Sequence, residues 1–319
     1  MPLRVAVQMD PLEGINIAGD STFALMLGAQ ARGHKLYQYL AADLTWQDGR
    51  LYAGAHDVTV QAVAGDHFRR GEFVILDLGK DVDVVLMRQD PPFDLGYITA
   101  THLLERIQHE TLVVNDPAGV RDAPEKVFVL DFAQYMPPTM VTRSIGAARH
   151  FLAEHGEIVL KPLHGNAGKA VFKIGRDGAN LAPLMELFNA TYEEPHMLQA
   201  FLPEVMDGDK RIVLVDGEVA GAINRKPKSG DIRSNLAAGG TAEASELTET
   251  EREICAALGP ELKRRGLLFV GIDVIGGRWL TEINVTSPTG IVAIDQFNGT
   301  DTPRLIWDAI ERRLTDTKN

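Results

Sequence analysis

Three side chains near the C-terminus have the types and spacing of a divalent-cation site. Asp273 precedes a glycine pair, and Glu282 and Asn284 follow it at alternate positions. Carboxylate and amide oxygens are hard ligands suited to Mg²⁺, which keeps some waters and completes its shell with nucleotide phosphates. The alternative is an exposed acidic strand face that binds nothing.

The face of the expected hairpin follows from its turn. If Gly276-Gly277 form a two-residue turn, Asp273 pairs with Leu280 and Gly271 pairs with Glu282. Side chains alternate along a strand, so Asp273, Glu282 and Asn284 would share one face. The opposite face would supply core residues, namely Ile272, Val274, Trp279 and Ile283.

Cationic side chains gather in the same part of an otherwise acidic chain. Lys161 lies inside an apolar run, residues 158–163, where a charge needs a partner such as a phosphate. Any one of these cations could instead form a salt bridge at the surface, but their number in one region favours a polyanionic ligand. The cations are Lys126, Lys161, Lys210, Arg211, Arg225, Lys226, Lys228 and Arg233.

A glycine-containing loop, residues 164–169, joins two extended runs and could close over phosphates as a flap, because backbone N–H groups of such turns bind anions. An ordinary hairpin loop is the alternative. The loop is not a Walker A motif, since Lys169 is not followed by Ser or Thr, and no G-x-G-x-x-G opens a helix, which disfavours a nicotinamide site. Zinc and serine-hydrolase motifs are absent from the sequence as well.

Composition and net charge limit the classes of partner that this protein can bind. The 319 residues carry 32 Lys and Arg against 44 Asp and Glu, a formal net charge of −12, which argues against general nucleic-acid binding. No apolar stretch is long enough to span a bilayer. The single cysteine, Cys255, cannot form an internal disulfide and lies in a helical pattern, so we expect a core residue and a cytoplasmic protein.

The secondary structure expected to position these residues differs between the first third of the chain and the rest. Strands over residues 4–9, 35–40, 82–88 and 111–115 alternate with helices, one capped by Ser21, and predict a parallel α/β sheet. From residue 123, short helices near 125–132 and 181–189 and strands over 158–163, 170–174 and 196–202 appear. Asp216-Gly217 marks a hairpin, and a polar loop, 226–241, precedes a helix over 248–265. We expect domains at 1–122, 123–201 and 202–319.

These pieces together resemble the ATP-grasp ligases, and within them the bacterial-type glutathione synthetases. The resemblance covers nearly the whole chain, and its most diagnostic segments are Arg88-Gln89-Asp90-Pro91-Pro92-Phe93-Asp94 and Asn235-Leu236-Ala237-Ala238-Gly239-Gly240. Residues 158–163, 207–211 and 281–289 add to it. The resemblance implies an α/β ATP-grasp fold, with an N-terminal parallel α/β domain and two α+β subdomains that clasp ATP.

The resemblance also implies a role for each site residue. Mg²⁺ or Mn²⁺ would be held by Asp273, Glu282 and Asn284, and Arg211 and Arg233 would be catalytic. ATP would be bound by Lys126, Lys161, Gly165, Asn166, Ala167, Gly168, Gln199, Ala200, Phe201, Leu202 and Asp209. The peptide substrate would be bound by Arg88, Arg225, Asn235, Gly239, Gly240, Ser287 and Thr289.

The implied reaction is the ATP-dependent ligation of γ-glutamylcysteine and glycine to glutathione, ADP and phosphate through an acyl phosphate. Two alternatives stay open: another ATP-grasp carboxylate–amine ligase, of the D-alanine–D-alanine or glutamate-adding type, and a non-catalytic ATP-binding protein of the same fold. The expected assembly is a homo-oligomer, a dimer or tetramer, without nucleic-acid or membrane partners.

Overall fold

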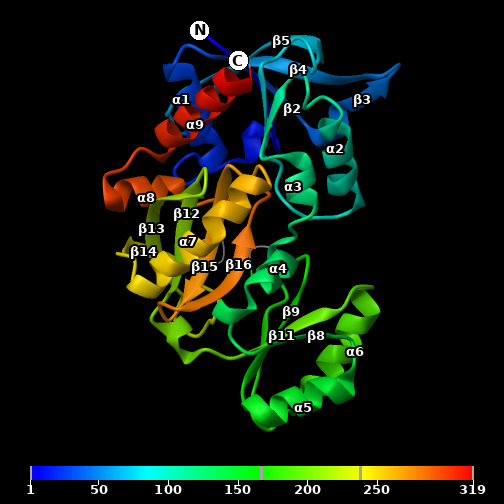
Figure 1. The fold of residues 1–319 in the computed structure, drawn as a ribbon, viewed down its shortest axis with the longest axis vertical. Helices are drawn as coiled ribbons and strands as arrows, with labels where there is room; N and C mark the ends of the chain where they lie inside the picture. Colours follow the sequence, from blue (N-terminus) through cyan, green and yellow to red (C-terminus); the bar gives the residue numbers. More distant parts are fainter. Residues whose placement is uncertain (1, 166–167, 237–238, 318–319) are drawn as a thin grey trace.

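Three β-sheets follow one another along the long axis of the molecule, with helices packed on them (Figure 1). The computed structural model describes residues 2–165, 168–236 and 239–317. The N-terminal sheet lies at one end, the sheet of the central residues lies at the other, and the sheet of the C-terminal third lies between them. The last sheet can therefore meet both of the others.

The first sheet has the parallel core that the sequence predicts. Its order is β2–β1–β6–β7, and all of these neighbours run parallel. The strands are short apolar runs that are almost wholly buried, as is usual for parallel strands covered on both faces. They are β1 (Arg4–Gln8), β2 (Lys35–Tyr39), β6 (Val84–Met87) and β7 (Leu112–Val114).

Antiparallel strands that the sequence analysis missed extend this sheet, which is therefore mixed. They are β3 (Leu44–Gln47), β4 (Arg50–Val60) and β5 (Phe68–Asp77), and β4 pairs with β2, β3 and β5. The sequence held one signal for β4, namely apolar residues at the alternate positions Leu51, Ala53 and Ala55. In the structure these residues are more buried than their neighbours. Asp48-Gly49 forms the β3–β4 turn with positive φ at both residues, 50° and 81°.

Helices of the first half differ in detail from the expectation. The N-cap of α1 (Ser21–Ala31) is Asp20, not Ser21, and the Asp20 carboxylate accepts a hydrogen bond from the Phe23 N–H at 2.6 Å. The helix expected near 125–132 is a single α-turn followed by a 3₁₀ segment, within which Phe132 leaves helical geometry. The other elements are α2 (Leu95–Glu105), α3 (Pro117–Arg121), α4 (Glu125–Phe128) and the 3₁₀ turns at Leu12–Gly14, Ala41–Asp43, Val129–Tyr135 and Pro203–Met206.

The second sheet is antiparallel, in the order β10–β9–β11–β8. Two helices cover one face, where Leu160 and Leu198 join their core. Because side chains alternate, Val159, Lys161 and Gln199 lie on the opposite face. The elements are β8 (Thr139–Thr142), α5 (Ile145–His155), β9 (Ile158–Pro162), β10 (Phe172–Ile174), α6 (Leu181–Thr191) and β11 (His196–Ala200).

The third sheet, in the order β14–β13–β12–β15–β16, is also antiparallel. The predicted hairpin at Asp216-Gly217 is confirmed, since Val215 pairs with Glu218 across it. The elements are β12 (Asp209–Val215), β13 (Glu218–Lys226), β14 (Thr241–Ala244), α7 (Glu249–Arg264), β15 (Phe269–Ile275), β16 (Trp279–Asn284) and α8 (Ile291–Asn298).

The β15–β16 hairpin has a different register from the predicted one. Ile275 pairs with Trp279, so the turn holds one residue more than expected, and Thr281 is an extra residue in β16. This bulge places Asp273 directly opposite Glu282, not opposite Leu280. Leu280 takes the core position expected for Trp279, which is only half-buried. The three oxygen-bearing side chains still share a face.

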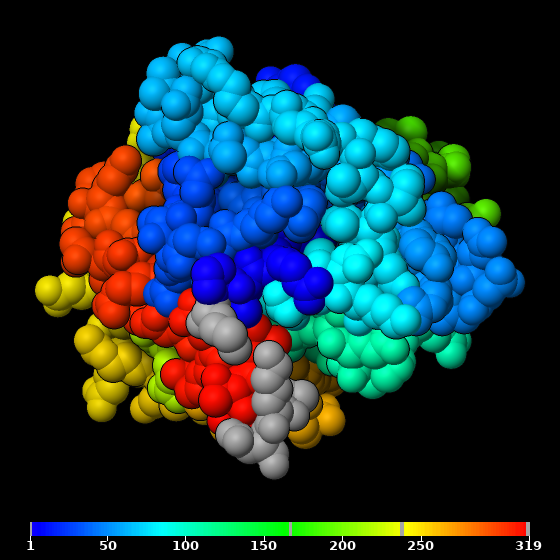
Figure 2. All heavy atoms as spheres, turned by 90° about the horizontal axis from the view of Figure 1, so that it is seen from above, coloured from blue at the N-terminus to red at the C-terminus, as the bar shows by residue number. Residues whose placement is uncertain are grey.

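The C-terminal helix α9 (Thr302–Thr317) returns to the first sheet and packs on α1. The Trp307 indole is fully buried there, and its Nε1 donates to the Leu25 carbonyl at 2.9 Å. Figure 2 shows the C-terminal residues, in red, against the N-terminal ones, in blue. The two ends of the chain thus share one core.

Two expectations drawn from the sequence, on the position of Cys255 and on membrane-spanning segments, can be compared with the structure. Cys255 lies in α7 with 4% of its surface exposed, which confirms its core position. Among the described residues, no helix combines the length and the apolar character needed to cross a membrane.

Candidate functional site

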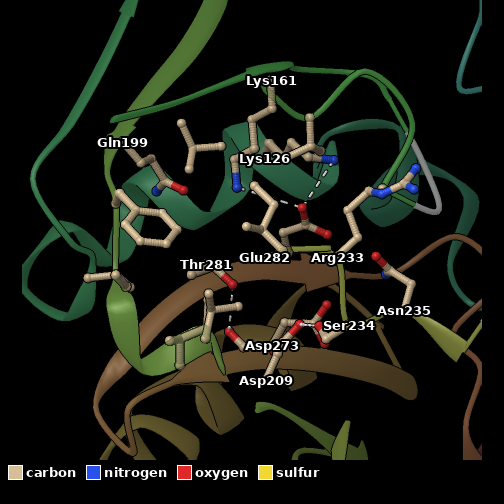
Figure 3. Close-up of a pocket in the computed structure, with 18 of the residues that line it drawn as sticks. Lys126, Lys161, Gln199, Asp209, Arg233, Ser234, Asn235, Asp273, Thr281 and Glu282 are labelled. Atoms are coloured by element: carbon tan, nitrogen blue, oxygen red, sulfur yellow. Dashed lines mark hydrogen bonds and ion pairs between the residues drawn. The ribbon is translucent and has the colours of Figure 1, made fainter. Parts of the chain in front are cut away.

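A first cavity of about 850 Å³ opens between the second and third sheets (Figure 3). The second sheet contributes Val159, Lys161 and Gln199 to its lining, and the third sheet contributes Asp209, Asp273, Ile275, Thr281 and Glu282. The alternation described above aims these side chains at one another.

Two buried lysines meet one carboxylate in this cavity. Lys126 Nζ lies 3.3 Å and Lys161 Nζ lies 3.7 Å from Glu282 Oε1, and Lys126 also donates to the Gly165 carbonyl at 2.6 Å. Burial lowers the pKa of Lys161. Burial acts in the same direction at Lys126, but the carboxylates of Glu282 and Glu125 outweigh it and raise the pKa. Lys161 has thus found an anionic partner, and both ammonium groups can also reach an added anion.

The end of the cavity near β11 is mainly apolar. Gln199, Ala200, Phe201 and Leu202 line it, together with Val205 and Ile275. The Gln199 amide is held by the Thr139 hydroxyl, to which its Nε2 donates at 3.0 Å. An apolar slot with a few oriented polar groups is what a flat base requires.

Two loops close the other side of the cavity. Gly165, Gly168, Arg233 and Asn235 line it. Gly168 has a φ of +72°, and a side chain on it would lie 2.8 Å from Asn235 Oδ1, so the two loops touch where only glycine fits. The expected phosphate ligands Asn166 and Ala167 lie outside the described residues.

Asp209 has a buried oxygen that faces this cavity without a hydrogen-bond donor. Arg225 and Ser234 both donate to Oδ2, at 2.6 and 2.8 Å, and Oδ1 has no partner among the described residues. Burial is the main cause that raises the pKa of Asp209 to about 6, against the effect of Arg225. Such an oxygen calls for a donor from a ligand or from water.

The expected cation ligands are brought together, but cations of the protein occupy them. Arg211 binds both oxygens of Asp273, at 2.6 and 3.1 Å, and Arg225 lies 3.0 Å from it. Burial raises the pKa of Asp273, but the arginines outweigh it and hold the pKa well below its usual range. Asn284 Nδ2 lies 3.5 Å from Asp273 Oδ2.

The donor set fits Mg²⁺ that is bound together with phosphates. The described residues contain no group of three or more His, Cys, Asp or Glu placed to hold a metal ion. Two carboxylates and one amide would leave the remaining positions to waters and phosphate oxygens, which is the usual arrangement for Mg²⁺.

A second cavity, of about 860 Å³, adjoins the first. Glu282 and Asn235 line both cavities, so they mark the junction. The predicted substrate residues that line the second cavity are Arg211, Arg225, Asn235, Ser287 and Thr289. Two arginines in a mostly polar pocket suit a ligand that carries carboxylates.

Other predicted residues lie away from both cavities. Arg88 is buried behind the wall of the second cavity, where its guanidinium donates to the Thr22 hydroxyl at 3.0 Å and the Pro288 carbonyl at 2.8 Å. Gly239 and Gly240 are not among the lining residues. Lys210 and Lys226 also lie outside, paired with Glu251 and Glu243.

Sequence reasoning missed several lining residues. Glu125 and Asp90 line the second cavity, and Ser234 and Thr281 line the first. Thr281 becomes a lining residue through the bulge in β16. Asp90 lies within one diagnostic segment and Ser234 directly precedes the other, and that position was the available signal.

Family models and curated relatives match this chain over nearly its whole length. Residues 3–121 match the model of the prokaryotic glutathione synthetase N-terminal domain, and residues 125–299 match that of the prokaryotic glutathione synthetase ATP-grasp domain. The glutathione synthetase of Rhodopseudomonas palustris is 56% identical over 313 residues, which cover 98% of this chain and 99% of that protein. That of Agrobacterium fabrum is 54% identical over 310 residues, 97% of each chain.

Solved structures agree at the level of the fold. A D-cycloserine synthetase has a TM-score of 0.69 at 18% identity and covers 97% of this chain and 99% of its own. An ATP-grasp RimK domain protein from Sphaerobacter thermophilus has a TM-score of 0.64 at 19% identity, with coverages of 96% and 98%. These likenesses show the ATP-grasp fold, and together with the matched domains and close relatives they show that the chain belongs to the prokaryotic glutathione synthetase family and is an ATP-dependent ligase.

Proposed function

We propose that the chain joins γ-glutamylcysteine to glycine through an acyl phosphate, with ATP in the first cavity and the amino-acid substrates in the second. The γ-phosphoryl group would pass to the cysteinyl carboxylate at the junction of the cavities. The glycine amine would then attack the acyl phosphate, forming the peptide bond and releasing phosphate.

The proposed nucleotide contacts follow the lining of the first cavity. Lys126 and Lys161 would bind phosphate oxygens in place of Glu282, with N–H groups of the 165–168 loop around them. Residues 199–202 would hold the adenine, and Asp209 Oδ1 would accept a hydrogen bond from the nucleotide.

Asp273, Glu282 and Asn284 would hold Mg²⁺, or Mn²⁺. A bound divalent cation supplies positive charge that stabilises the transferring phosphoryl group. Of the protein's own groups, the lysines would position the nucleotide phosphates, and Arg211 and Arg225, which pair with Asp273, would yield an Asp273 oxygen to the cation.

Arg211, which lines the second cavity, and Arg233, which lines the first, would stabilise the negative charge that forms on the reacting carboxylate. Arg225, Asn235, Ser287 and Thr289 would bind the peptide. We assign Arg88 an indirect role, because its hydrogen bond to the Pro288 carbonyl holds the segment that carries Ser287 and Thr289. Gly239 and Gly240 would shield the intermediate as part of the 235–240 loop.

The observation that carries this proposal is the shared wall of the two cavities, where Glu282 pairs with two buried lysines. A phosphate donor on one side and a carboxylate acceptor on the other would meet at this wall. The test is ADP release from ATP with γ-glutamylcysteine, with and without glycine. Release that requires both substrates supports the proposal, and release that requires two copies of another amino acid contradicts it.

Three further expectations stay predictions: the homo-oligomer, the cytoplasmic location and the absence of nucleic-acid and membrane partners. The acidic net charge of −12 supports the exclusion of nucleic acid.

A further inference from the structure

The second cavity has an uneven distribution of charge. Three carboxylates line it: Asp90, Glu125 and Glu282. Glu282 is paired with two lysines, as described above. Glu125 and Asp90 differ from Glu282, because among the described residues no lysine, arginine or histidine nitrogen forms an ion pair with either of them. The Thr286 hydroxyl donates a hydrogen bond to Glu125 Oε1 at 3.0 Å.

The position of Glu125 follows from the short helix α4. Glu125 and Lys126 are adjacent, and their side chains serve different cavities: Lys126 lines the first and Glu125 lines the second. Lys126 reaches Glu282 at the junction. The Glu125 carboxylate therefore lies on the acceptor side of the place where the phosphoryl group would be transferred.

The substrates bring two ammonium groups that need anionic partners. One belongs to the γ-glutamyl end of the dipeptide, remote from the reacting carboxylate, and the other belongs to glycine, whose nitrogen must lie beside it. Glu125 is next to the junction, whereas Asp90 follows β6 of the first sheet, and its N–H donates to Asp10. Glu125 is thus suited to the glycine ammonium, which lies beside the reacting carboxylate. Asp90 is suited to the ammonium at the γ-glutamyl end of the dipeptide.

We propose that Glu125 binds the ammonium group of the incoming amino acid and holds its nitrogen beside the acyl phosphate; the ammonium releases one proton to water before the nitrogen lone pair attacks the acyl carbon and phosphate leaves. This assignment rests on the proposed function. The Thr286 hydrogen bond orients one carboxylate oxygen, and the other oxygen is left for the ligand. Burial is the main cause that raises the pKa of Glu125, so pairing with a cation relieves an unfavourable ionised state.

The test compares two amines in the same enzyme. Glu125→Gln keeps the shape and can still accept the Thr286 hydrogen bond, but it removes the charge. We expect KM for glycine to rise by about 10- to 100-fold, the usual effect of a lost charged hydrogen bond, with KM for ATP and for γ-glutamylcysteine nearly unchanged. Hydroxylamine, which is uncharged near neutral pH, should trap the acyl phosphate as a hydroxamate at the rate of the unsubstituted enzyme.

Two further variants complete the test. Glu125→Asp, which keeps the charge, should recover part of the glycine affinity, and Asp90→Asn should raise KM for the dipeptide instead. Overturning results are a rise in KM for the dipeptide alone, an unchanged KM for glycine, or a parallel loss of hydroxamate formation in Glu125→Gln. If the unsubstituted enzyme forms no hydroxamate from γ-glutamylcysteine and ATP, the proposed function itself fails, which is a separate result.

Discussion

Glu282 connects the two cavities at the scale of single residues. Its carboxylate pairs with Lys126 and Lys161, and it lines both cavities. Burial raises the pKa of Glu282, but the two lysines outweigh burial and lower it, so the carboxylate is ionised. Phosphate oxygens that bind the lysines would release this carboxylate for a cation, which would couple the binding of nucleotide and metal.

Glu282→Gln should lower kcat by roughly 100-fold or more, because it keeps the shape but removes a charge from the proposed Mg²⁺ site. Circular dichroism should show an unchanged fold. Glu243→Gln is the matched control, since Glu243 lies in the same sheet, pairs with Lys226 at 3.0 Å and lines neither cavity. Normal turnover of Glu282→Gln at saturating Mg²⁺ would refute the metal assignment.

Arg233 lines the first cavity, pairs with Asp231 at 2.6 Å and keeps 40% of its side chain exposed. Arg233→Ala should lower kcat by roughly 100-fold and change ATP affinity little, because the guanidinium would meet charge that forms only during the reaction. Steady-state kinetics and nucleotide titration separate these effects.

The control for this variant is Arg278→Ala, in which the guanidinium removed stacks on Trp279 at the hairpin turn, outside both cavities. If Arg233→Ala weakened ATP binding while kcat held, Arg233 would be a nucleotide contact.

At the scale of elements, irregularities in regular structure place the functional groups. The extra residue Thr281 in β16 moves Glu282 opposite Asp273, and the single turn of α4 directs adjacent side chains to different cavities. His34, directly before β2, is one of the residues that contact α9. His34 Nδ1 accepts from the Leu3 N–H at 3.2 Å, which leaves the proton on Nε2, 3.1 Å from Glu311.

His34 should make stability depend on pH. Burial is the main cause that lowers its pKa below the ordinary value of about 6.5. As pH falls from about 7 to 5, the unfolded ring takes up a proton that the folded ring does not, so the free energy of unfolding should decrease. His34→Gln removes this dependence, and the stability difference between the two proteins should shrink on acidification.

Urea unfolding at several pH values measures this difference. His109→Gln, at a histidine with 74% of its side chain exposed, should leave the pH dependence unchanged. A gap between wild type and His34→Gln that widened at low pH would show that His34 is protonated in the fold and pairs with Glu311 as a cation.

At the scale of the whole molecule, α9 joins the last residues of the chain to the first sheet. Arg32, directly after α1, binds Asp308 and Glu311 of α9 at 2.5 and 3.0 Å, around the buried Trp307. Residues from both ends of the chain form one hydrophobic core with β12 and α8. The first sheet and the C-terminal third should therefore unfold together.

Trp307→Ala should lower the free energy of unfolding by about 3–5 kcal/mol, because it leaves a cavity in that shared core and removes the donor to Leu25. Trp46→Ala, at a tryptophan that is 44% exposed, should cost less than about 1 kcal/mol. Urea unfolding followed by circular dichroism compares them. If the first sheet and the C-terminal third of the unsubstituted protein unfolded in separate transitions, the shared core would be contradicted.

Local patterns in the sequence determined much of this protein. Short apolar runs predicted the parallel strands, Asp216-Gly217 predicted a hairpin, and a lysine inside a strand at position 161 indicated an anionic partner. The diagnostic segments around Arg88 and Asn235 identified the family. All of these signals depend on neighbours in the chain, because alternation and turn type are properties of a few consecutive residues.

Only the tertiary structure decided how distant residues meet. The register of Asp273 against Glu282 depends on a bulge that packing selects, and Arg88 supports the wall of the cavity whose ligand the family resemblance implied it would bind. Lys126 and Glu282 are far apart in the chain and become partners only when α4 docks beside β16. The physical reason is that strand pairing and burial of charge depend on the whole packed molecule, whereas periodicity depends on one segment.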